Sequence, residues 1–168
     1  HDRVRRSVIP MLVLGIDPGT AITGYGLVRE TDSGDLSVVD FGVIRTSSKK
    51  AMPQRLLEIY RSLGEIISDH EPDSSAVEKL FFQRNVSTAI SVGQGRGAVL
   101  VALAKADIPI AEYNPMEIKQ AVSGYGGADK HQMQKMIQVL LGLDQIPQPD
   151  DAADALAVAV CHLHSYRM

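Results

Sequence analysis

The segment MLVLGIDPGTAITGYGLV, residues 11–28, constrains the fold more than any other part of the chain. The apolar residues that open it are typical of a buried strand, and Pro18-Gly19 then predicts a turn. A second strand-like run follows at residues 23–28, so the pair predicts a β-hairpin. Asp17 ends the first strand, where an aspartate is often only a turn-former because its side chain can bond nearby backbone. A structural role and a chemical role for Asp17 both stay open at this point.

The rest of the pattern predicts a mixed α/β domain. Residues 36–44 add a third strand after a short polar turn, which favours an antiparallel meander. Apolar residues at i, i+3 and i+4 spacing predict a helix over residues 53–69. The later expected elements are a strand ending at Glu78, a largely buried helix over 85–106, a strand over 108–113, a helix capped by Asn114, and helices over 131–141 and 151–164. This order predicts a mixed five-stranded sheet flanked by helices.

Length and composition indicate a globular protein. The chain has 168 residues, of which 45% are hydrophobic and 22% charged, values that suit a single domain over residues 11–168. We interpret residues 1–10 as a remnant of cloning or a mobile N-terminal arm. Cys161, the one cysteine, lies in an apolar run and favours a reducing, cytoplasmic location. The longest apolar stretch is too short to cross a bilayer, so we expect no membrane contact.

Three further carboxylates stand in positions like that of Asp17. Glu78 ends the strand SSAVE, and Asp151 and Asp154 lie three residues apart at the start of the last helix, on one face of it. Taken separately, each of them can be a surface residue or an acid that caps a helix or complements its dipole. Asp154, however, has small apolar neighbours on both sides, and burying a carboxylate among them is costly unless it is paired.

Local sequence offers these acids no cationic partner. Neither Lys nor Arg lies within one helical turn of Asp154. Clustered carboxylates would repel each other, and a divalent metal resolves the repulsion, since Mg²⁺ prefers carboxylate and water oxygens. Two such ions about 3.5–4 Å apart can activate water and steady the leaving oxygen of a phosphodiester. The acids therefore favour metal-dependent phosphodiester hydrolysis.

Four motifs in order, LGIDPGT…TGYGLV, AVEKLFFQRN, GQGRG and DDAADALAVAVCH, resemble the RuvC family of bacterial Holliday-junction resolvases, in the ribonuclease H-like superfamily. The resemblance runs from residue 11 to about residue 164. It implies a ribonuclease H-like fold and a DNA endonuclease that resolves Holliday junctions in recombination and repair by paired, symmetric two-metal hydrolysis. By resemblance the metal-binding and catalytic acids are Asp17, Glu78, Asp151 and Asp154, with two Mg²⁺ or Mn²⁺ ions per active site. Asp150 is a rival for the third position, although D-x-x-D spacing favours Asp151.

The resemblance also implies DNA contacts. It assigns Phe81 to an unstacked base near the crossover, where an aromatic ring offers a stacking platform, and it places Lys119 and Lys130 near the cleaved strand. Phe82, as the neighbour of Phe81, would point the other way in an extended segment. The four acids account for −4 of the formal net charge of −3, so the rest of the chain sums to +1. Arg84 and other cations can then form a local basic surface for phosphates.

The implied partners are a four-way DNA junction, a second copy of the chain and a branch-migration motor of RuvA and RuvB. A two-fold junction cut at two symmetric positions matches a C₂ homodimer. The helix over residues 85–106 is a candidate for part of the dimer interface, although its small residues suit intramolecular packing equally well.

Three alternatives remain. GIDPGT also resembles the phosphate loop of actin-like ATP-binding proteins, which need two such domains, whereas this chain has the length of one. A ribonuclease H-like nuclease acting on RNA would differ by contacting a 2′-hydroxyl, which sequence does not reveal. A catalytically silent junction-binding module is disfavoured because all four acids are present.

Overall fold

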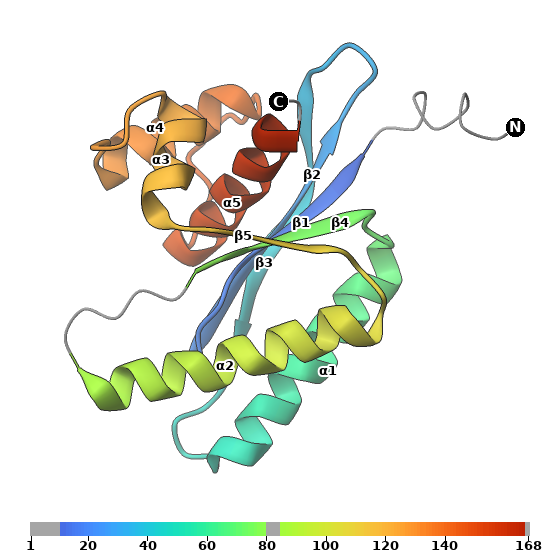
Figure 1. Cartoon of the computed structure of the whole chain (residues 1–168), viewed down its shortest axis with the longest axis vertical. Helices are drawn as coiled ribbons and strands as arrows, with labels where there is room; N and C mark the ends of the chain where they lie inside the picture. Colours follow the sequence, from blue (N-terminus) through green and yellow to red (C-terminus); the bar gives the residue numbers. More distant parts are fainter. Residues whose placement is uncertain (1–10, 80–84, 167–168) are drawn as a thin grey trace, which may run out of the picture.

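The computed structural model describes residues 11–79 and 85–166, which form a five-stranded sheet with helices on both faces (Figure 1). The strands lie in the order β3-β2-β1-β4-β5. Their bounds are β1 Leu12–Asp17, β2 Ile22–Glu30, β3 Leu36–Arg45, β4 Ser74–Glu78 and β5 Ile110–Tyr113. The helices are α1 Met52–His70, α2 Val86–Lys105, α3 Pro115–Ser123, α4 Lys130–Leu140 and α5 Asp150–Tyr166. The ribonuclease H-like arrangement expected from the sequence is confirmed.

The sheet is mixed because its connections differ in length. Short turns join β1, β2 and β3, which pair antiparallel as the expected meander. The chain then returns through α1 and α2, and such helical crossovers are what parallel pairing requires. β4 accordingly pairs parallel with β1, and β5 pairs parallel with β4. β1 therefore lies at the centre of the sheet, with the meander on one side and the parallel strands on the other.

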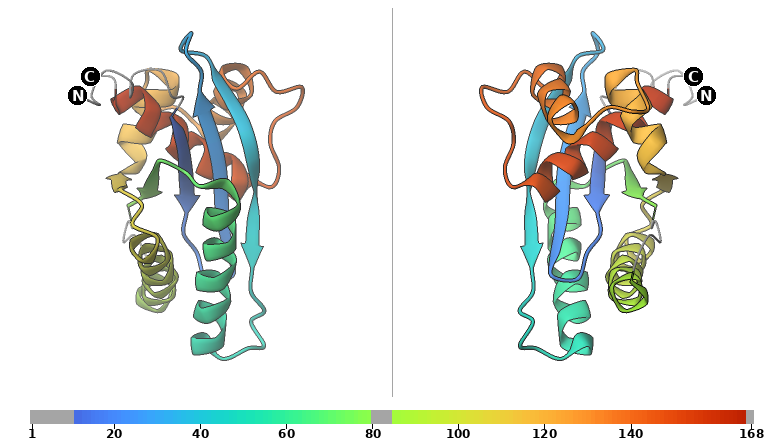
Figure 2. Two further views of the ribbon diagram at one scale, coloured as in Figure 1. Left: turned by 90° about the vertical axis from the view of Figure 1, so that its right-hand side faces the viewer. Right: turned by 90° about the vertical axis from the view of Figure 1, so that its left-hand side faces the viewer.

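The helices form two layers, one on each face of the sheet, and each layer packs on the sheet through its own hydrophobic core (Figures 1 and 2). One core joins the sheet to α3, α4 and α5, and the other joins it to α1 and α2. Alternation along β1 divides the side chains, since Val13 belongs to the α5 side while Leu12 and Leu14 belong to the α1 side. Odd-numbered residues of β1, Asp17 included, therefore face the α5 layer.

The expectation of a largely buried helix over residues 85–106 is wrong in its burial. In α2 only Gly95, Val99, Ala102 and Leu103 are buried, and Val86, Ile90 and Val101 are 77%, 57% and 58% exposed. The buried helix is α5, in which every residue from Ala152 to Leu163 except Asp154 is buried. An apolar composition does not say whether a helix turns its apolar side to a core or to the surface.

α2 is also the one helix among the described residues that is long and apolar enough to cross a membrane. Length and composition alone are weak evidence, since helices in the cores of globular proteins meet the same criterion. α2 packs along α1, with Val99 and Leu103 in the shared core.

Polar caps fix the ends of the helices that approach the sheet edge. Asn114 and Glu117 form the expected capping box of α3. A second capping box, between Asp129 and Gln132, starts α4 at Lys130, one residue earlier than predicted. α5 likewise starts one residue early, at Asp150.

Candidate active site

Two of the four acids meet because their strands are parallel neighbours. The register pairs Ile16 of β1 with Val77 of β4, so the carboxyl ends of both strands lie side by side. Asp17 and Glu78 are the next residues and end these strands. Glu78 lies on the same face as Ser74, whose hydroxyl hydrogen-bonds His162 of α5 at 2.9 Å. Both carboxylates are therefore directed to the α5 side of the sheet edge.

Glycines bring the start of α5 to the same edge. Gly24 of β2 pairs with Asp17 across the hairpin. A Cβ atom at Gly24 would lie only 1.9 Å from the Asp151 carbonyl oxygen, and one at Gly15 would lie 2.2 Å from the Ala155 carbonyl oxygen. The backbone of α5 thus rests directly on the backbone of β1 and β2. Sequence reasoning missed this role, although the alternation of glycines in LGIDPGT…TGYG was its visible signal.

The electrostatics show that all four acids share one neighbourhood, which we call the acidic cluster: Asp17, Glu78, Asp151 and Asp154. Burial is the main cause that raises the pKa of Asp17 to about 8, and the charges of the other three add to it. A hydrogen bond from the protonated Asp17 carboxyl group to the Glu78 carboxylate also raises the pKa of Asp17 and lowers that of Glu78. The pKa of Glu78 is raised by burial and by Asp154, and burial also raises the pKa of Asp154. The cluster carries more negative charge than its surroundings stabilise.

The donor set of the acidic cluster fits a hard divalent cation. It offers only carboxylate oxygens, the ligands that Mg²⁺ and Mn²⁺ prefer. Among the described residues, no three Asp, Glu, His or Cys side chains form a preformed metal cage. Mg²⁺ keeps several of its waters and binds through one or two carboxylates, so an open arrangement suits it.

Two lysines, remote in sequence, approach the cluster and supply the cations that local sequence lacks. Lys119 of α3 lowers the pKa of Glu78, and Lys130 of α4 opposes the raised pKa of Asp154. Together with Glu78 and Asp154 they line a cavity of about 250 Å³ beside the cluster. The two lysines that the resemblance assigns to the cleaved strand thus lie beside Glu78 and Asp154.

Asp150 differs from Asp151 in its partners, because its carboxylate is bound by Lys130 and Gln134 of α4. Its Oδ2 lies 2.7 Å from Lys130 Nζ, and its Oδ1 accepts a hydrogen bond of 3.0 Å from Gln134 Nε2. Lys130 holds the pKa of the exposed Asp150 carboxyl below its ordinary value. Asp151, by contrast, is one of the charges that raise the pKa of Asp17. Asp150 and Asp151 both add to the raised pKa of Asp154, but of the two only Asp151 also acts on Asp17, which favours Asp151 as the member of the cluster.

Phe81 and Arg84 lie outside the described residues. Arg96 of α2, another cation near this edge of the sheet, is bound within the protein. It donates a hydrogen bond to the carbonyl oxygen of Glu78 and pairs with Glu112. Its side chain is 13% exposed, so it secures the end of β4 more than it offers charge to solvent.

Comparison with known proteins places the chain in a family. The model described as "Crossover junction endodeoxyribonuclease RuvC" matches residues 13–162. A protein of that description from Syntrophomonas wolfei is 55% identical over 158 residues, covering 94% of this chain and 91% of the relative. The Thermus thermophilus RuvC structure is 38% identical with a TM-score of 0.88, covering 94% of this chain and 96% of that one. The structure described as T. thermophilus RuvC in complex with Holliday junction substrate is 35% identical with a TM-score of 0.86, at the same coverage.

Neither the family nor the fold favours an actin-like ATP-binding domain or an RNA-directed nuclease. The match extends over nearly the whole chain at more than half identity. The chain belongs to the RuvC family of crossover junction endodeoxyribonucleases.

Proposed function

We propose that this endonuclease cuts four-way DNA junctions at two symmetric positions, and that the acidic cluster is its two-metal hydrolytic centre. The observation that carries the proposal is the convergence of four carboxylates from β1, β4 and α5, in which burial and the neighbouring acids raise the pKa values of Asp17, Glu78 and Asp154. Perturbed pKa values of this kind mark functional sites. The substrate class is supported by the T. thermophilus relative, which is described in complex with a Holliday junction.

Asp17, Glu78, Asp151 and Asp154 would hold two Mg²⁺ or Mn²⁺ ions. When bound, such ions supply an activated water and charge stabilisation for the leaving oxygen. The protein's own contribution is to fix the carboxylates on rigid elements, two at strand ends and two on the first turns of a helix. Positions on strands and helices are more precise than positions on loops.

Lys119 and Lys130 would contact the phosphate backbone beside the cut. Both line the cavity next to Glu78 and Asp154, and Lys130 has an exposed side chain whose ammonium group Asp150 holds at 2.7 Å. An ammonium group carries three donors, so Lys130 can keep Asp150 and still bind a phosphate oxygen. Phe81 and Arg84 stay predictions for the DNA surface on the strength of the resemblance alone.

The enzyme would act as a homodimer, because a junction has two-fold symmetry and needs two incisions. The exposed apolar residues Val86, Ile90 and Val101 of α2 are suited to such an interface. The proposal further includes a cytoplasmic location, where bacterial DNA lies, and cooperation with a branch-migration motor of RuvA and RuvB.

The direct test is cleavage of a four-way junction and a matched linear duplex, each with Mg²⁺, with Mn²⁺ and without metal. We expect paired nicks confined to the junction and dependent on metal. Asp17→Asn and Glu78→Gln should each lower the cleavage rate more than about 100-fold. Replacing a residue that only hydrogen-bonds a metal ligand already lowers activity by about 10- to 100-fold. Junction binding by both variants should stay close to that of the parent, because the phosphate contacts remain.

Asp73→Asn serves as the matched control, since Asp73 precedes β4 at the opposite end from Glu78. Normal cleavage by Asp17→Asn or Glu78→Gln would contradict the site. Equal cleavage of the linear duplex, or faster cleavage of an all-RNA junction, would contradict the substrate.

A further inference from the structure

We propose that Arg55 and Lys49 form a second contact with the DNA backbone, binding a phosphate a few nucleotides from the one that is cut. This inference rests on the proposed function and adds a site to it. The contact lies where β3 leads into α1 and where the turn after Asp17 meets α2.

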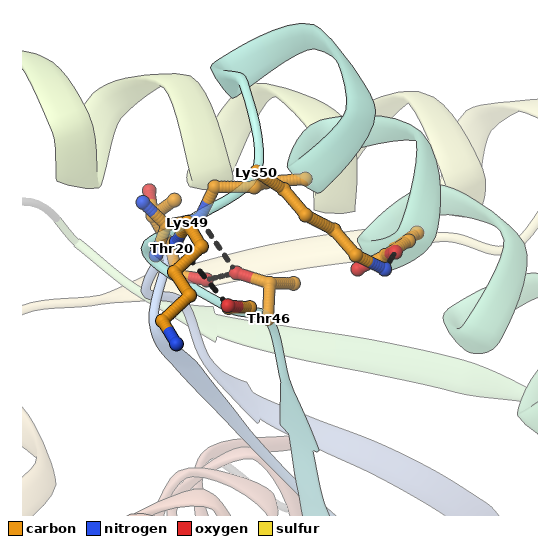
Figure 3. Close-up of polar contacts among 7 residues, drawn as sticks. Thr20, Thr46, Lys49 and Lys50 are labelled. Atoms are coloured by element: carbon orange, nitrogen blue, oxygen red, sulfur yellow. Dashed lines mark hydrogen bonds and ion pairs between the residues drawn. The ribbon is translucent and has the colours of Figure 1, made fainter.

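The connection from β3 to α1 is tied firmly to the turn that follows Asp17. The Thr46 hydroxyl donates a 2.6 Å hydrogen bond to the Thr20 carbonyl oxygen, and the Thr46 amide donates to the Ala21 carbonyl oxygen at 3.0 Å. Thr20 in turn donates through its hydroxyl to the Ser91 carbonyl oxygen of α2. Thr20 and Thr46 are both buried, and Figure 3 shows them together beside Lys49. Three elements therefore meet in one fixed corner.

Arg55 is held in this corner by one edge only. Its Nε donates a 2.9 Å hydrogen bond to the Thr46 hydroxyl, which fixes the plane of the guanidinium group. In the part of the chain that the structure describes, its Nη1 and Nη2 groups have no hydrogen-bond partner. A planar guanidinium with two free amino groups is well suited to the oxygens of a phosphate.

A cleft opens in front of Arg55. It has a volume of about 410 Å³ and lies between the turn after Asp17, α1 and the first turns of α2. Thr88 and Ser91 line it from α2, and their hydroxyl groups have no partner among the described residues. The Arg55 cleft, as we call it, thus joins one oriented cation to two available hydroxyl donors, a set that suits a phosphodiester oxygen.

The charge around the Arg55 cleft is one-sided. Residues 45–55, RTSSKKAMPQR, carry four cations and no acid. Lys50 turns toward α1 and pairs with Glu58, whereas Lys49 lies on the other side, beside Thr20 and Thr46 (Figure 3). Lys49 is exposed and its ammonium group is unpaired within the described residues. Lys49 therefore adds an uncompensated charge beside Thr46, the residue to which Arg55 is hydrogen-bonded.

The Arg55 cleft lies near the acidic cluster, because Thr20, which lines the cleft, is close to Asp17 in the sequence. Thr20 follows Asp17 by three residues, so their Cα atoms are at most about 11 Å apart. Each nucleotide of a strand advances about 3.4 Å along a duplex axis. A strand whose phosphate lies at the acidic cluster would therefore present another phosphate to the Arg55 cleft within a few nucleotides.

The test measures binding of a four-way junction by proteins that also carry Asp17→Asn, so that no cleavage interferes. In plots of log affinity against log salt concentration, Arg55→Gln and Lys49→Gln should each make the slope shallower by about 0.9, the value for one phosphate contact with duplex DNA. Arg55→Gln should weaken binding by about tenfold or more, as expected for a hydrogen bond to a charged group. Arg29→Gln is the matched control, because Arg29 pairs with Leu12 at the opposite end of β1 from Asp17.

A second arm uses junctions that carry one neutral methylphosphonate at a time along the cleaved strand. The parent should lose affinity at a position within a few nucleotides of the cut, and Arg55→Gln should lose nothing further there. Lys49→Gln guards against a folding defect in Arg55→Gln, because the Lys49 ammonium group has no hydrogen-bond or ion-pair partner among the described residues, whereas Arg55 is bonded to Thr46. Unchanged salt slopes in both variants, or identical methylphosphonate profiles for parent and Arg55→Gln, would overturn the second contact. Neither result touches the proposed function, which is tested separately by cleavage of the junction with the enzyme that keeps Asp17.

Discussion

Asp17 illustrates how a single residue can be unfavourable for the folded chain and useful to it. Its folded pKa of about 8 lies above the ordinary value of 3.8 because burial and three neighbouring acids oppose ionisation. The folded state therefore binds the Asp17 proton more tightly than the unfolded state does. Stability from this group is fully present below about pH 4 and is lost as pH rises through the folded pKa.

We predict a corresponding difference between the metal-free parent and Asp17→Asn. As pH rises from 5 to 8, the free energy of unfolding of the parent should fall relative to that of the variant. Saturating Mg²⁺ should restore the parent at pH 8 and leave the variant nearly unchanged, since the cation replaces the proton. Urea denaturation at both pH values, with and without Mg²⁺, measures this. Parallel pH profiles would show that Asp17 ionises freely in the folded protein.

At the residue scale, the sequence indicated the places of the acids at the ends of strands and the start of a helix, but local sequence did not indicate their cationic neighbours. Asp17 and Glu78 were recognisable because each ends an apolar strand, a position that places a polar side chain at a sheet edge. The approach of Lys119 and Lys130 was not predictable from local sequence, since tertiary packing of α3 and α4 creates it. Local sequence likewise does not reveal that His162 of α5 is buried and that its ring nitrogens form hydrogen bonds of 2.9 Å with Ser74 and 2.7 Å with Tyr113.

At the scale of elements, the contact of α5 with the hairpin decides where the acids stand. Helix backbone meets strand backbone at Gly24 and Gly15, where any side chain would collide with α5. Helices usually pack on sheets through larger side chains, which would hold α5 farther from Asp17. The glycines of the hairpin therefore belong to the site as much as the acids do, although they carry no chemistry.

Gly24→Ala should test this contact. The added methyl group would lie 1.9 Å from the Asp151 carbonyl oxygen, so α5 must move away from the hairpin. We expect a loss of about 1–3 kcal/mol in stability, typical of overpacking, and a disproportionate loss of cleavage. Gly64→Ala on α1 is the control, because a Cβ atom there meets nothing within 4 Å. It should stabilise the protein by up to about 1 kcal/mol, and normal cleavage by Gly24→Ala would contradict the argument.

Element boundaries were predicted to within two residues because their signals are local. Asn114 with Glu117 is a capping box, and the alternation in the first strands has a period that side chains reveal directly. The burial of α2 was mispredicted because burial depends on what lies opposite a helix, which local sequence does not contain. Val86, Ile90 and Val101 are apolar, yet they face outward.

At the scale of the whole molecule, the exposed side of α2 lies on the layer opposite to α5 and the candidate active site (Figure 1). A partner bound there would leave the acidic cluster of each copy open to DNA. Two such sites related by a two-fold axis match the symmetry of a four-way junction.

The proposed homodimer gives a prediction at this scale. Val101→Glu should shift the protein toward a monomer in light scattering, because a charge is placed where an apolar contact is expected. Junction cleavage should then change from paired nicks to single ones, while the acidic cluster is untouched. Val139→Glu on α4 is the control, since Val139 is 72% exposed on the other layer. A parent that is monomeric at the concentrations of the cleavage assay would contradict the dimer.

The glycine contact also bears on how such a protein changes over evolution. Where main chain rests on main chain, the spacing between the backbones of the hairpin and of Asp151 does not depend on the rotamer of any side chain packed between them. Apolar residues elsewhere in both cores can then be exchanged for others of similar volume without altering the distance across which the reaction must work. The core residues can therefore change during evolution while the backbone around the acids keeps its geometry.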